Sequence, residues 1–102
     1  MTVLEKLEET RLYFDNPERW LQGSSSSVGM KSMCLWRRID CVKTIKTVYS
    51  VLPFRFRFLS LFSDNGMPKE GAVIMFNDHP KTNHKDIIRV LDKAIKKAKR
   101  RN

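Results

Sequence analysis

The feature that most constrains the fold of this chain is its C-terminal part, in which a polar turn leads into an amphipathic helix. The turn contains short polar side chains and Pro80. Asn83 suits the N-cap position, and Asp86 follows three residues later, as in a capping box. Apolar residues then recur at helical spacing, namely Ile87, Leu91, Ala94, Ile95 and Ala98. This pattern predicts a helix with one buried face and one basic face.

Length and composition indicate one globular domain. The chain has 102 residues, of which 41% are hydrophobic and 30% charged. These are ordinary values for a folded protein, and the length leaves no room for a second independent core. No apolar run approaches the ~20 residues of a membrane helix, and the first residues lack a signal-peptide profile. We therefore expect a single domain over residues 1–102, a cytoplasmic location and no membrane contact.

The positive charge is unevenly distributed along the chain. The formal net charge is +9. Residues 1–20 carry five acidic and three basic side chains, so the remaining chain holds an excess of eleven positive charges. This asymmetry indicates an anionic partner, which could be nucleic acid or an acidic protein surface. A solubilising surface is the other interpretation.

Helical patterns account for most of the N-terminal half. Residues 2–14 read as a helix capped by Thr2, and Asn16 with Pro17 predicts a short helical turn over 18–22 that Trp20 anchors in the core. A Ser-rich segment at 23–31 is expected to be a flexible connector. A central helix is then predicted from residue 31 or 32 to residue 52, where Pro53 ends it.

The segment between Pro53 and the turn is ambiguous. Residues 54–62 begin with strict alternation, which favours a strand, but their apolar residues also fit one face of a helix. We favour a helix there, an irregular connection over residues 63–71 and an extended or single-turn piece over 72–76. The predicted fold is an all-α bundle of three main helices and a short fourth element. The alternative is an α+β fold with a hairpin of residues 54–62 and 72–76.

The turn and last helix resemble a family of short bacterial and phage proteins whose function is unknown. The residues that carry this resemblance are Phe76, Asn77, Asp78, Pro80, His84, Asp86, Ile87, Ile88, Leu91, Asp92, Ala94 and Ile95. Phe76 stands where the family usually has tryptophan, and Trp20 and Cys34 match two upstream features. The resemblance implies a mainly helical fold and a small protein of a bacterium or phage-infected cell. It implies no activity.

A thiol hydrolase is the sharpest catalytic hypothesis. Cys34, His84 and Asn77 or Asp78 are residue types that such an enzyme uses. A buried Cys34 that acts as a small hydrophobe is the favoured interpretation. Cys34 and Cys41 lie too far apart on a helix for a disulfide, so we expect reduced thiols. We predict no catalytic residue.

Metal binding also has little support in the sequence. His79, His84 and Asp78 lack the spacing of a metal site, and neither cysteine belongs to a CxxC pair. We therefore predict no metal and no cofactor. The polar residues of the turn are assigned a structural role as turn and helix cap. They are Asn77, Asp78, Asn83 and His84.

Binding through basic side chains is the favoured function. The candidate residues for a nucleic-acid or acidic-protein partner are Lys93, Lys96, Lys97, Lys99, Arg100, Arg101, Arg55 and Arg57. Arg37 and Arg38 could complete the patch. The first hypothesis is nucleic-acid binding by the C-terminal helix, and the alternative is an adaptor or inhibitor that docks on an acidic protein. A solvated C-terminal end that frays over residues 96–102 is the third interpretation.

Overall fold

The computed structural model describes residues 2–22, 35–39, 42–53, 56–57 and 68–101, with the side chains of residues 36, 37, 68–70 and 101 excepted. Its elements are α1 (Val3–Tyr13), the 3₁₀ helix η1 (Pro17–Arg19), α2 (Leu35–Ile39), α3 (Val42–Val51), α5 (Pro68–Asp78) and α6 (His84–Arg101). This helical content confirms the predicted all-α class. Within the described residues, no helix has the length and apolar character that crossing a membrane requires.

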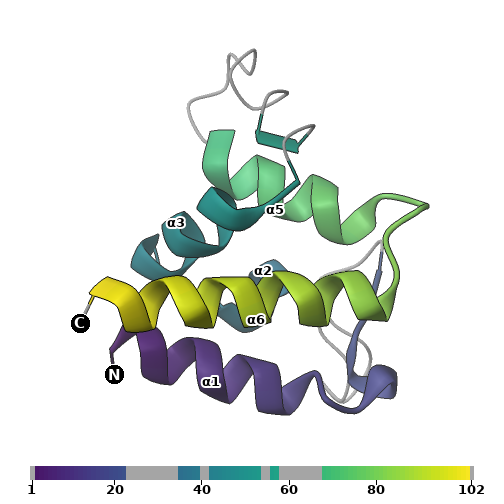
Figure 1. Cartoon of the computed structure of the whole chain (residues 1–102). Coiled ribbons are helices and arrows are strands. Elements are labelled where there is room, and N and C mark those ends of the chain that lie inside the picture. The colour runs from purple at the N-terminus through teal and green to yellow at the C-terminus, as the bar shows by residue number, and fades with distance from the viewer. Residues whose placement is uncertain (1, 23–34, 40–41, 54–55, 58–67, 102) are drawn as a thin grey trace.

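Helix α6 lies at the centre of the arrangement. It runs antiparallel to α1 along one side and packs against α3 on another, while α5 packs against α2 and α3 (Figure 1). Its inward stripe is fully apolar and consists of Ile87, Val90, Leu91, Ala94 and Ala98. The predicted buried face is therefore present, although Val90 is buried and Ile95 only partly so.

Thr2 and Asn83 cap the N-terminal ends of α1 and α6, as predicted. Thr2 and Glu5 exchange two hydrogen bonds of 3.1 Å in a capping box. At α6, Asn83 Oδ1 accepts from the Asp86 backbone N–H, and Asp86 Oδ2 accepts from the Asn83 N–H, each at 3.0 Å. Helix α6 then continues to Arg101, over the segment that we expected to fray.

Helix α5 corrects the prediction for residues 68–76. We expected an irregular connection followed by an extended piece, but Pro68–Asp78 is one helix. Its buried residues are Ala72, Val73, Phe76 and Asn77. This is helical spacing. It was not recognised because residues 68–71 were read as an irregular connection and Asn77 was assigned to the turn. The hairpin alternative is wrong, since residues 72–76 are helical.

The predictions for the turn after Asn16, the central helix and segment 54–62 can be compared with the structure only over the described residues. Asn16 caps η1 by accepting from the Glu18 N–H at 3.0 Å, but η1 ends at Arg19 and not at residue 22. The central helix ends before Pro53, as expected, and is described as α2 and α3 on either side of residues 40–41. Only Phe56 and Arg57 of segment 54–62 are described, and both are helical. The segment 23–31 lies outside the described residues.

Candidate nucleic-acid interface

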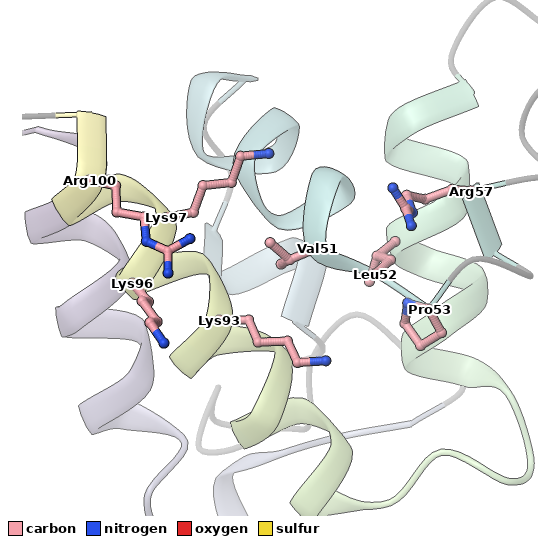
Figure 2. A pocket seen from close by; sticks show the side chains of 8 residues that line it. All are labelled: Val51, Leu52, Pro53, Arg57, Lys93, Lys96, Lys97 and Arg100. Atoms are coloured by element: carbon pink, nitrogen blue, oxygen red, sulfur yellow. The ribbon is translucent and has the colours of Figure 1, made fainter.

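An open groove of about 770 Å³ lies between the C-terminal part of α6 and the end of α3. We call it the basic groove. It is lined by Val51, Leu52, Pro53, Arg57, Lys93, Lys96, Lys97 and Arg100. Figure 2 shows the four α6 side chains on one side, Arg57 and Pro53 on the other, and Val51 and Leu52 between them. Every charged residue in this lining is a cation.

The spacing of the four α6 cations explains why they share one wall. Lys93, Lys96, Lys97 and Arg100 follow one another at steps of three, one and three residues, which keeps them on one face of a helix. From Lys93 to Arg100 the helix rises about 10 Å. The buried apolar stripe beside this face fixes its direction, because α6 cannot rotate without exposing Leu91 and Ala94.

The acidic residues of α6 do not neutralise this face. Asp92 accepts from Arg11 Nε of α1 at 2.9 Å, and Asp86 lies 4.0 Å from Arg89. Among the ion pairs between described residues, none involves the four α6 cations of the groove. No described carboxylate therefore lies within ion-pair distance of these four cations, and their positive charge favours an anionic partner.

Arg57 reaches the groove from a different part of the chain. Its side chain is half-buried, and the Tyr49 hydroxyl donates to its backbone carbonyl at 3.2 Å. This bond joins Arg57 to α3. The sequence identified Arg57 as a candidate, but only the tertiary structure brings it to the same groove as α6.

The structure divides the predicted basic set. Lys99 is exposed on α6 but does not line the groove. Arg101 belongs to α6 and Arg37 to α2, but their side chains are not described. Arg55 lies outside the described residues altogether. Arg38 does not join the patch, because it donates to Glu9 Oε1 at 2.9 Å and its guanidinium lies 4.5 Å from the Tyr13 ring centroid.

The apolar lining was not predicted from the sequence. Val51 is half-buried, Leu52 is buried and Pro53 is exposed. The sequence predicted that the helix ends before Pro53. In the structure, this end of α3 lies opposite α6. Its position beside the basic face depends on how α3 and α6 pack, which the local pattern does not specify.

Asn77, by contrast, is committed to holding the fold together. Its side chain is fully buried. Oδ1 accepts from Trp20 Nε1 at 2.7 Å and from the Leu35 N–H at 2.9 Å. Nδ2 donates to the Leu21 carbonyl at 3.0 Å and to Asp78 Oδ1 at 2.8 Å. All four hydrogen-bonding positions of the amide are thus used within the fold.

Two further side chains secure the turn after α5. Gln22 Nε2 lies within hydrogen-bond distance of three carbonyl oxygens, those of Asn77, His79 and Thr82, at 3.1, 2.6 and 3.3 Å. His84 Nε2 contacts the carbonyl oxygen of Phe14 at the end of α1. The sequence indicated neither of these connections. They support a structural role for these residues, although Asn77 and Asp78 are the last residues of α5 and do not belong to the turn as predicted.

The two histidines named in the catalytic and metal hypotheses have different partners in the structure. Cys34 and Cys41 lie outside the described residues. His79 Nδ1 accepts from the Lys81 N–H at 3.1 Å and its ring meets Phe56 edge-on, whereas His84 turns to Phe14. In the described part of the chain, no three His, Cys, Asp or Glu side chains gather in a way that could hold a metal ion.

Comparison with known proteins identified no relative of this chain. No protein-family model matches the chain, and no curated protein or solved structure was found to match it. The resemblance of the turn and last helix to a phage and bacterial family therefore stays a prediction.

Proposed function

We propose that this protein binds nucleic acid through the basic groove. The observation that carries the proposal is the convergence of Arg57 with four α6 cations on one groove whose described lining holds no acidic residue. Nucleic acid presents a dense row of phosphates, and neutralising them releases condensed counterions. A groove with this concentration of positive charge matches such a partner.

The proposed contacts do not depend on base sequence. Lysine and arginine side chains on phosphates fix the position of a nucleic acid but carry no sequence information. The α6 stripe of about 10 Å spans roughly three phosphates at about 3.4 Å per nucleotide of a stacked strand. We therefore expect salt-sensitive binding of several phosphates.

Fluorescence anisotropy with a labelled oligonucleotide tests the proposal. Affinity should fall as salt rises from about 50 to about 200 mM, with a slope set by the number of phosphates contacted. The double variant Lys93→Glu/Lys96→Glu should bind at least about 10-fold more weakly and with a smaller salt slope, because it loses two phosphate contacts.

A matched control variant has the same net charge as the groove variant. Lys85→Glu/Lys99→Glu alters two exposed α6 lysines that do not line the groove. It should lose much less affinity than the groove variant, while circular dichroism shows both to be folded. Absent binding at low salt, or equal losses in the two variants, would refute the proposal. Tighter binding of polyglutamate than of the oligonucleotide would favour an acidic protein partner instead.

A further inference from the structure

The apolar part of the basic groove indicates which form of nucleic acid fits it. Val51, between the α6 cations and Arg57, and Pro53, on the same side as Arg57, expose apolar surface in the groove (Figure 2). Phosphates make no use of such surface. A partner that fills the groove must therefore present apolar groups beside its negative charges.

Single-stranded nucleic acid has this combination, whereas a duplex does not offer it. In a duplex the flat faces of the bases are stacked inside, and the outside presents phosphates and groove edges. In a single strand, base faces and sugars are free to lie on protein surface while the backbone follows a positively charged groove.

The packing of α6 argues against its use as a helix that enters a duplex. A recognition helix must project from the protein to enter the major groove. Helix α6 is flanked by α1, to which the Arg11–Asp92 ion pair joins it, and by α3 on another side (Figure 1). Only a strip of its surface is therefore available. A narrow exposed face of α6 beside the apolar surface of Val51 and Pro53 suits a flexible single strand better than a rigid duplex.

We infer that the basic groove holds a short segment of single-stranded nucleic acid. Its phosphates lie along the α6 cations, and its sugars and bases contact Val51 and Pro53. This inference rests on the proposed function, because it specifies the partner of the same groove.

Comparing two probes tests the inference. An oligodeoxythymidine strand and a hairpin duplex with the same number of phosphates are titrated at equal salt. The single strand should bind at least about 10-fold more tightly. The double variant Val51→Thr/Pro53→Ala should weaken single-strand binding about 3- to 10-fold and leave the salt slope unchanged, because it removes no charge.

The chain offers a matched control for the apolar change. Val42 lies on the same helix, is 60% exposed and does not line the groove. Val42→Thr should leave single-strand affinity unchanged. Thermal unfolding of all variants identifies any loss that arises from instability, and Val51→Thr alone replaces the double variant if Pro53→Ala unfolds the protein.

The outcomes separate the inference from the proposed function. If the hairpin binds as tightly as the strand and both depend on Lys93 and Lys96, the inference is wrong and the proposed function stands. If neither probe binds at low salt, both fail. A single-strand affinity that Val51→Thr/Pro53→Ala leaves unchanged also overturns the inference, since the apolar surface would then have no part in binding.

Discussion

The indole Nε1 of Trp20 donates a hydrogen bond of 2.7 Å to the buried side chain of Asn77. This bond joins the chain after η1 to the C-terminal end of α5. The same amide also accepts from the first described residue of α2, Leu35. Three segments that are distant in sequence therefore meet at one side chain, and this junction positions the turn that starts α6.

Asn77→Ala should destabilise the fold by about 3 kcal/mol, because it leaves buried donors and acceptors without partners. Urea unfolding followed by circular dichroism measures the change. Trp20→Phe, which removes one donor and keeps an aromatic ring, should cost about 1–2 kcal/mol. A loss below about 1 kcal/mol for Asn77→Ala would show that the junction does not hold the segments together.

Neutral His84 should carry its proton on Nε2. The partner of Nε2 is the Phe14 carbonyl oxygen, which can only accept, so the ring nitrogen must donate. Long-range ¹H–¹⁵N NMR distinguishes the two tautomers. An Nδ1–H tautomer in the neutral form would be inconsistent with this bond.

The Arg11–Asp92 pair should contribute modestly to stability. Arg11 Nε and Asp92 Oδ1 are 2.9 Å apart, but their side chains are 30% and 58% exposed. A double-mutant cycle with Arg11→Gln and Asp92→Asn should give a coupling of about 0.5 kcal/mol that shrinks as salt is added. A coupling that does not respond to salt would argue against a screened surface pair.

The capping box of α1 predicts a pH dependence. Hydrogen bonds from the Thr2 backbone N–H and hydroxyl lower the pKa of Glu5. A lowered folded-state pKa means that the stabilisation is present above the ordinary glutamate pKa and is lost as pH falls through the folded value. Carboxyl ¹³C titration by NMR should show the pKa of Glu5 rising in Thr2→Ala. An unchanged titration would exclude the Thr2 hydroxyl as a cause and leave the backbone N–H of residue 2, which the substitution keeps.

Gly71→Ala should stabilise the protein by about 0.5–1 kcal/mol, because glycine inside a helix costs backbone entropy. Gly71 lies within α5, and outside its own helix and chain neighbours no described atom lies within 4 Å of an added Cβ. Thermal unfolding measures the gain. Destabilisation would indicate that residue 71 is not in a regular helix.

Local patterns were enough to predict the helices with clear caps. The cap residue Thr2 and the pair Asn83 and Asp86 are signals contained within one turn of chain, so no distant contact is needed to interpret them. Helix α5 was missed for the opposite reason. Its buried face includes Asn77, whose burial is favourable only because Trp20, Leu21 and Leu35 satisfy its amide.

The sequence by itself determined the helical class, the capped ends of α1 and α6 and the basic face of α6, because these follow from the spacing of neighbouring residues. The tertiary structure decided which cations act together. Packing of α6 against α3 brings Lys93 and Arg57 to one groove, while Glu9 holds Arg38 elsewhere. These choices depend on contacts between segments that are distant along the chain, and residue spacing carries no information about them.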